Sequence, residues 1–177
     1  QQRSSAASDV YKRQQLQYVI GKENFDNTLK KYFNDWSFKH PKPNDFIRSA
    51  EKVSGLELDW YLLDWAQSTM TIDYSINSIY GVDNKTRVVL KRIGQMGMPI
   101  DLRVELLNGE VLDYNIPMTK MRGSKPVSSS TILKSWSWAK PYYELYIDID
   151  SKSISKITID PKNEMADINR NNNYLVL

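Results

Sequence analysis

The sequence contains a single histidine and no cysteine. His40 lies between Lys39 and Pro41, in a segment where a lone imidazole is ordinarily solvated. Without cysteine, the chain cannot supply a disulfide, a thiolate nucleophile or a cysteine-ligated metal site. We therefore assign no catalytic, cofactor-binding or metal-binding residue in this sequence, and we expect His40 to act neither as a ligand nor as a base.

Several aspartates raise the question of a calcium site. Asp148-Ile149-Asp150-Ser151 begins like an EF-hand loop, but Ser153 stands where that loop needs glycine and Ile159 where it needs glutamate. An EF-hand is therefore excluded, and alternation makes Asp148 and Asp150 the solvent face of a strand. The remaining alternative is calcium at a sandwich edge, with ligands from Asp148, Asp150, Asp160 or Asp167.

The densest group of aromatic residues is another candidate for binding. It consists of Trp136, Trp138, Tyr142, Tyr143 and Tyr146. An exposed aromatic platform could stack a sugar or a base. Burial in a core or at a domain interface is the favoured interpretation, because the group includes residues of both parities and large aromatics dominate buried contacts.

The overall composition excludes several function classes. The 177 residues include 24 basic and 21 acidic side chains, and the net charge of +3 is too small to indicate a nucleic acid partner. We expect the basic groups Lys91-Arg92 and Lys120, Arg122 and Lys125 to be solvated. No apolar run approaches the length of a membrane span, and residues 1–14 lack both the order of a signal peptide and any helical period.

Apolar residues with a helical period fill the first third of the chain. Residues 15–20 are expected to end a helix at Gly21, and residues 23–36 carry one apolar stripe. After two prolines, Asn44 is the expected N-cap of a third helix that ends at Ser54-Gly55. Ser54 and Glu57 are spaced as a capping box for a fourth helix, which carries Leu58, Tyr61, Leu62 and Trp65 on one face.

After Thr69 the period of apolar residues changes from 3.6 to 2, which predicts a domain boundary. Residues 100–106 and 111–116 alternate, and Asn108-Gly109 between them predicts a type I′ hairpin turn. Residues 117–130 are polar and predict a mobile loop. At least six short strands separated by turns indicate an antiparallel β-sandwich, so the predicted fold class is α+β, helices followed by a sandwich.

Short phrases along the chain resemble one enzyme family. Phe46, Glu51, Ser54-Gly55, Leu58, Trp60 and Trp65 resemble the phrase that closes the helical peptidase domain of M1-family zinc aminopeptidases, which are gluzincins. Other phrases resemble a bacterial subgroup of that family: residues 20–25, 29–33, 96–101, 116–118, 121–123, 136–138 with Pro141, 159–161 and 165–172. The resemblance runs from about Gln15 to the end of the chain.

The resemblance implies a domain organisation and a function. Residues 15–70 would be the last helices of an M1 peptidase domain, and residues 71–177 the β-sandwich domain of the family. The parent enzyme would use zinc to remove N-terminal residues from peptides, its peptide substrates binding to a peptidase domain outside this chain. Such an enzyme needs H-E-x-x-H and a later glutamate, so a chain with one histidine would bind no zinc and be inactive alone.

Further expectations complete this interpretation. We interpret residues 1–14 as non-native, with a disordered native arm as the alternative. The apolar helix faces would otherwise contact the rest of the peptidase domain, so the chain alone should self-associate. Members of the subgroup are commonly periplasmic or on the cell surface. The alternatives are a stand-alone β-sandwich module that binds a peptide or glycan, and an inactive M1 homologue that acts as a scaffold.

Overall fold

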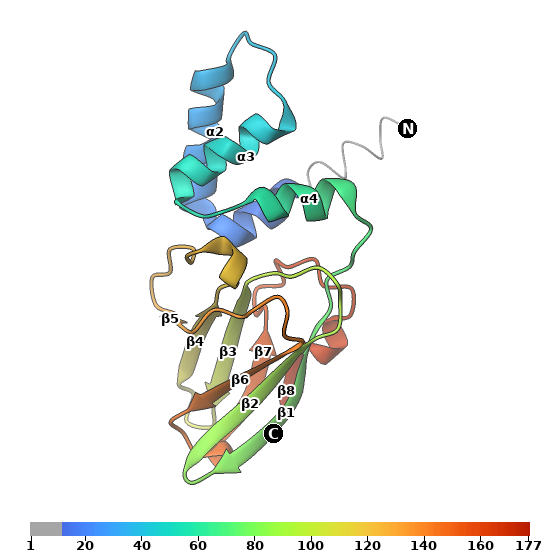
Figure 1. Ribbon diagram of the computed structural model, residues 1–177. Coiled ribbons are helices and arrows are strands. Elements are labelled where there is room, and N and C mark those ends of the chain that lie inside the picture. The colour runs from blue at the N-terminus through green and yellow to red at the C-terminus, as the bar shows by residue number, and fades with distance from the viewer. Residues whose placement is uncertain (1–11) are drawn as a thin grey trace. The chain divides into compact units, whose positions relative to one another are not determined.

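The computed structural model describes residues 12–177, which divide into two compact units (Figure 1). The helical unit comprises Gln1–Thr69, described from residue 12 onward, together with Lys120–Pro126. The sheet unit comprises Met70–Thr119 and Val127–Leu177. Of the segment interpreted as non-native, residues 1–11 lie outside the described residues. Residues 12–14 are helical, although the sequence of residues 1–14 shows no helical period.

From residue 12 onward, the helical unit contains four α-helices. Residues 12–20 form the first, followed by α2 (Lys22–Trp36), α3 (Pro43–Ser54) and α4 (Asp59–Gln67). Gly21 has a φ of 85°, so glycine ends the first helix as expected. The buried side chains of this unit include Leu16, Val19, Ile20, Ile47, Ala50 and Leu58. Among residues 12–177, no helix combines the length and the apolarity that crossing a bilayer requires.

Two helix starts differ from the prediction. The third helix begins at Pro43, and Asn44 is not its cap: the Asp45 carboxylate accepts a hydrogen bond from the Lys42 backbone N–H at 2.7 Å. The Ser54–Glu57 capping box does not form either, because residues 55–58 are not helical and the Ser54 hydroxyl donates back to the Ala50 carbonyl. The Glu51 carboxylate instead accepts from the Leu58 backbone N–H at 2.8 Å, just before α4.

Residues 120–126 belong to the helical unit although they lie within the sequence of the sandwich. The carbonyl of Met121 accepts a hydrogen bond from the Glu57 N–H at 3.0 Å, and the Met121 side chain is completely buried. Lys125 donates to the Tyr18 carbonyl and lies 4.3 Å from the centre of its ring. The prediction of a mobile loop over residues 117–130 is therefore wrong for this segment, whose contacts are remote in sequence.

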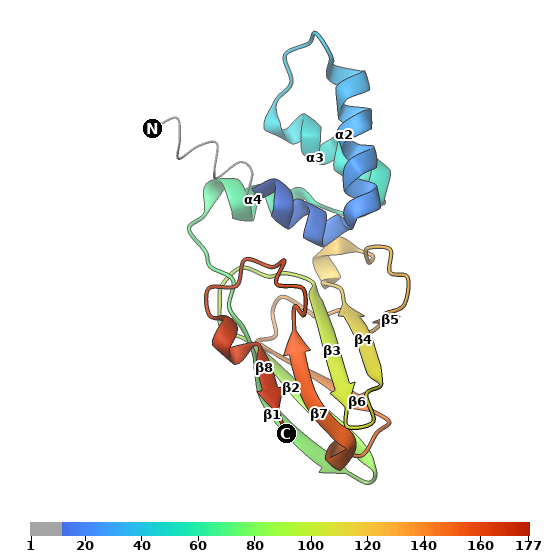
Figure 2. The ribbon, with the colours of Figure 1, turned by 180° about the vertical axis from the view of Figure 1, so that it is seen from behind.

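The sheet unit contains two sheets that stack as layers. The smaller has the order β1 (Tyr74–Val82), β2 (Lys85–Arg92), β6 (Tyr142–Ile147). The larger has the order β5 (Thr131–Ile132), β4 (Val111–Ile116), β3 (Ile100–Leu106), β7 (Ile154–Ile159), β8 (Tyr174–Val176). The smaller sheet faces the viewer in Figure 1 and the larger in Figure 2. Apart from the parallel β4–β5 pair, neighbouring strands are antiparallel, and the chain is α+β as predicted.

The two tight hairpins use different turns. Asp83 and Asn84 both have positive φ between the paired residues Val82 and Lys85, which is the pattern of a type I′ turn. At Asn108-Gly109 only the glycine has positive φ, and its N–H donates to the Leu106 carbonyl at 3.0 Å. The predicted type I′ turn is therefore wrong there, and the hairpin has a type I turn followed by a left-handed glycine.

Candidate functional site

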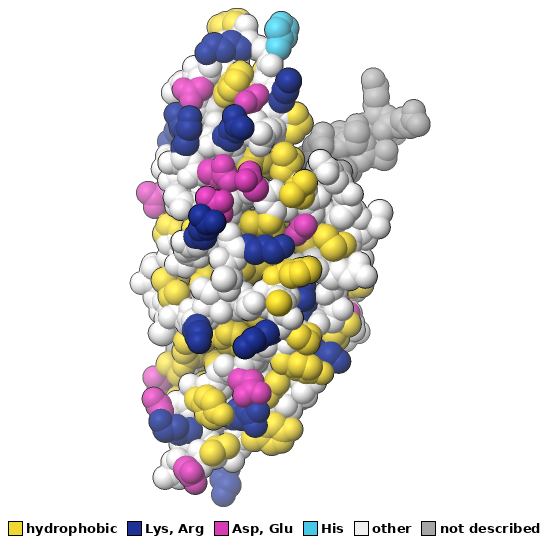
Figure 3. Space-filling view, viewed as in Figure 1, with side chains coloured by type: hydrophobic (Ala, Val, Ile, Leu, Met, Phe, Trp, Pro, Cys, Tyr) yellow, Lys and Arg dark blue, Asp and Glu magenta, His cyan; other side chains and the backbone are white. Residues whose placement is uncertain are grey.

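The helical unit carries an apolar groove with a volume of about 990 Å³. We call it the helical groove. Its walls come from the first helix, α2, α3, α4 and the turn after α2. Figure 3 shows exposed hydrophobic side chains among charged ones on this unit.

The stripe predicted on α2 forms one wall of the groove. Leu29, Phe33 and Trp36 line it, and they recur at intervals of four and three residues along the helix. Leu29 is 40% exposed and Phe33 is 71% exposed. Tyr32 is held edge-on against Phe46 of α3, with ring centres 5.1 Å apart. The sequence identified this stripe, and the structure leaves much of it open to solvent.

The stripe predicted on α4 forms another part of the lining. Tyr61 and Trp65 pack with ring centres 5.7 Å apart, and Leu62 lies beside them in the lining. The buried Tyr61 hydroxyl donates to the Lys12 carbonyl, and burial raises the pKa of this phenol well above its usual range. Tyr61 therefore acts as an uncharged anchor between α4 and the first helix.

The charged residues of the groove have one sign. Among the described lining residues, Lys12, Arg13, Lys30 and Lys39 are basic and none is acidic. Lys39 donates to the Asp35 carbonyl and lies 5.8 Å from the centre of the Trp36 ring, which fixes it at the edge of the groove. An apolar groove with a basic rim can bind another molecule.

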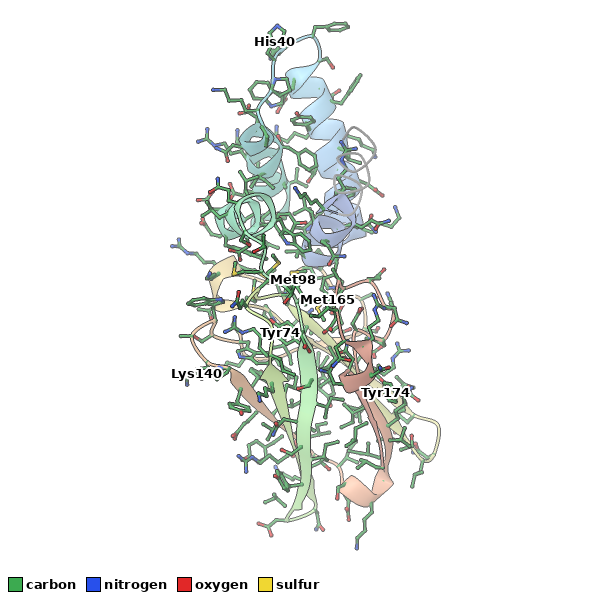
Figure 4. The ribbon with its side chains drawn as sticks, turned by 90° about the vertical axis from the view of Figure 1, so that its right-hand side faces the viewer. His40, Tyr74, Met98, Lys140, Met165 and Tyr174 are labelled. Carbon is green, nitrogen blue, oxygen red and sulfur yellow. The ribbon has the colours of Figure 1, made fainter. Side chains whose placement is uncertain are left out.

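Among the described residues, His40 joins no group of three possible metal ligands. It is exposed in the turn between α2 and α3, and Figure 4 shows it on that loop. Among the described residues, one set of three acidic side chains, Glu51, Glu57 and Asp59, has oxygens within 4.8 Å of one another. Figure 3 shows acidic side chains gathered over this connection between α3 and α4. Glu51 already accepts a hydrogen bond from the Leu58 N–H, so this member of the set stabilises the start of α4.

The four aspartates of the calcium alternative have separate partners. Asp148 is exposed and forms an ion pair with Lys85 at 2.6 Å, and Asp150 accepts from the Lys152 N–H at 3.0 Å. Within residues 12–177, neither Asp160 nor Asp167 joins a group of three acidic residues at ligand spacing. Nothing in the geometry of the described residues therefore favours calcium.

Asp160 and Asp167 instead anchor the last part of the sheet unit, a role that the sequence did not suggest. Asp160 is 3% exposed and accepts from the N–H groups of Glu164 and Met165, and its burial raises its pKa to about 6. Asp167 accepts from the N–H groups of Tyr74 and Asn169, and burial raises its pKa as well. The Tyr74 hydroxyl and the Met98 N–H lie 2.8 Å apart, and both residues are labelled with Met165 in Figure 4.

The aromatic group does not form a single platform or a single core. Trp136 is buried between Tyr74 and Tyr143, at 5.4 and 5.3 Å between ring centres. Trp138, Tyr142 and Tyr146 are exposed, and Arg92 and Lys91 lie over Trp138 and Tyr142. Burial was therefore predicted correctly for Trp136 alone, with Tyr143 half-buried. Of the basic groups expected to be solvated, Lys91, Arg92 and Lys125 were predicted wrongly, since each is only partly exposed and lies over an aromatic ring.

Comparisons with known proteins show a similarity of fold. No protein-family model matches the chain, and no curated protein matches it. Among solved structures, the chain is similar to the crystal structure of Legionella pneumophila aminopeptidase A in complex with aspartic acid, with a TM-score of 0.53 and 16% identity. The similarity covers 85% of this chain and 16% of that one. The fold is therefore similar to part of an aminopeptidase.

Proposed function

We propose that this chain is the non-catalytic C-terminal part of an M1-type zinc aminopeptidase. The observation that carries the proposal is the similarity of 85% of the chain to a piece of an aminopeptidase, reached independently of the family phrases in the sequence. In this proposal the helical unit completes the peptidase domain, and the sheet unit is the β-sandwich that follows it. The parent enzyme binds zinc and its peptide substrates through residues outside this chain.

The role of this part is to support the peptidase domain. The helical groove exposes aromatic and aliphatic side chains of α2 and α4, which in a complete enzyme would be covered. Residues 120–126 tie the sequence of the sandwich to the helices through Met121 and Lys125. This part would therefore stabilise the helices on one side of the catalytic domain, and it would contribute no group to the hydrolysis.

The test begins with the coding DNA upstream of the codon for Gln15, read across its junction with the codons for residues 1–14. We expect it to continue into H-E-x-x-H and a later glutamate ligand. The extended protein should then hydrolyse an aminoacyl 4-methylcoumarin amide, and a chelator should abolish this activity. The chain of residues 1–177, supplied with zinc under the same conditions, should show no hydrolysis above background.

Two results would contradict the proposal. One is a start codon and leader at the junction with no zinc motif upstream. The other is an extended protein that retains H-E-x-x-H but folds and hydrolyses peptides equally well when residues 15–177 are deleted.

A further inference from the structure

The shape and charge of the helical groove indicate what kind of molecule fills it. We propose that its occupant is an amphipathic helix whose polar flanks are acidic. This inference rests on the proposed function only in naming the source of the helix, which would be the remaining peptidase domain of the parent enzyme. The choice of a helix, and of its charge, follows from the groove.

The spacing of the lining residues favours a helix as the occupant. On α2, Leu29, Phe33 and Trp36 form a ridge of residues three and four apart, and on α4 Tyr61 and Trp65 form another. An incoming helix packs its own ridges between such rows at an interaxial distance of about 8–10 Å. Four surrounding helical segments can thus contact several of its faces, as happens when an amphipathic helix binds in a hydrophobic groove.

The charge of the rim favours acidic flanks on that helix. Lys12 and Arg13 come from the first helix, whereas Lys30 and Lys39 come from α2 and the turn that follows it. The basic side chains therefore lie on different walls of the groove, and no acidic lining residue of the described chain offsets them. Carboxylates on the flanks of the occupant would complement them, whereas lysines would face like charges.

The same charge pattern argues against a second copy as the occupant. In a symmetric dimer formed groove to groove, the two identical rims would oppose each other. Lys12, Arg13, Lys30 and Lys39 would then meet the same four residues of the partner, at a cost that only high salt would reduce. A helix with acidic flanks gains apolar contact without this repulsion.

The experiment uses two synthetic helices with an identical leucine stripe, one flanked by glutamates and the other by lysines, each carrying a fluorophore. Fluorescence anisotropy measures their binding to the 177-residue chain. We expect the glutamate-flanked helix to bind at least about tenfold more tightly at low salt, and its affinity to fall as salt increases. Far-UV circular dichroism should show that the bound peptide gains helix.

Variants of the rim test the contribution of charge. The double variant Lys30→Glu, Lys39→Glu should weaken binding of the glutamate-flanked helix by about tenfold or more. The matched control is Lys22→Glu, Lys31→Glu, which reverses two charges on α2 that pair with Asp26 and Asp35 outside the groove lining. The control should bind the helix as the unmodified chain does. The variant Phe33→Ala should weaken the binding of both peptides, since Phe33 contributes apolar surface rather than charge.

Other outcomes would overturn the inference. Equal binding of the two helices, or equal effects of the rim variant and its control, would show that charge does not select the occupant. If neither helix binds and the chain forms a dimer that Phe33→Ala dissociates, the groove is occupied by a second copy. The proposed function fails separately, on the absence of the zinc motif upstream, so the two failures can be told apart.

Discussion

The buried carboxyl of Asp160 holds the loop that follows β7. Both of its oxygens accept backbone N–H groups, from Glu164 and Met165, and it is among the least exposed acidic residues described. Its positive φ of 50° places the chain in the left-handed region directly after β7. A shifted carboxyl pKa is common in active sites. Here both oxygens of Asp160 accept hydrogen bonds from backbone N–H groups of the loop that follows it.

The raised pKa of Asp160 predicts a pH dependence of stability. Its pKa is about 6 in the folded chain against an ordinary 3.8, so the folded state binds the proton more tightly than the unfolded state. The carboxyl therefore stabilises the folded state fully below about pH 4, and this contribution is lost as the pH rises to about 6, at about 1.4 kcal/mol for each pKa unit. Asp167 shifts in the same direction.

The variant Asp160→Asn should weaken the dependence of the free energy of unfolding on pH. Urea unfolding at pH 4 and at pH 7, followed by near-UV circular dichroism, should show a smaller decrease in the free energy of unfolding for the variant than for the unmodified chain. Asp148→Asn is the control, because Asp148 is exposed and its carboxylate pairs with Lys85. If both variants have the slope of the unmodified chain, Asp160 does not titrate in this range.

At the level of elements, the sequence predicted the central parts of helices and strands better than the residues at which they begin and end. The 3.6-residue and 2-residue periods identified α2, α3, α4 and the β3–β4 hairpin, although α2 leaves part of its apolar stripe exposed. The cap supplied by Glu51 could not be read, since it depends on the non-helical path of residues 55–58. Strand β8 was missed because three exposed residues at a sheet edge carry no alternation. The sequence predicted the apolar stripes that line the groove. It could not predict the basic rim, because the rim combines residues from separate elements.

Gly55 offers a test of one helix end. It has a φ of 70°, and an added Cβ would meet nothing within 4 Å, so a substitution there acts through backbone conformation alone. Gly55→Ala should lower the free energy of unfolding by about 1 kcal/mol. Gly55→Asn should cost less, since asparagine tolerates the left-handed region. Thermal unfolding of both variants checks the order, and an alanine variant as stable as the asparagine variant would contradict it.

The stability of the helical unit should depend on residues 120–126, which come from the sequence of the sandwich. Met121 is fully buried in the helical unit, so Met121→Ala should destabilise that unit by roughly 2–5 kcal/mol. Val111→Ala, at a half-exposed position of β4, is the control and should cost much less. Hydrogen exchange of α3 and α4 amides measures the effect locally. Unchanged protection in the Met121 variant would mean that the segment does not hold these helices.

For the molecule as a whole, the exposed groove predicts self-association. Phe33 and Leu29 leave apolar surface in contact with water, which favours association of the chain in the absence of an occupant. The basic rim opposes close approach of two grooves, so association should increase with salt, as Lys12, Arg13, Lys30 and Lys39 are screened. Light scattering at tens of micromolar chain, at low and at high salt, measures this. Phe33→Glu should keep the chain monomeric at both, because a charge would replace the most exposed ring of the groove. An unmodified chain that is monomeric at both salt concentrations would contradict the prediction. Association that weakens with salt would also contradict it, because the contact would then depend on ion pairs outside the groove.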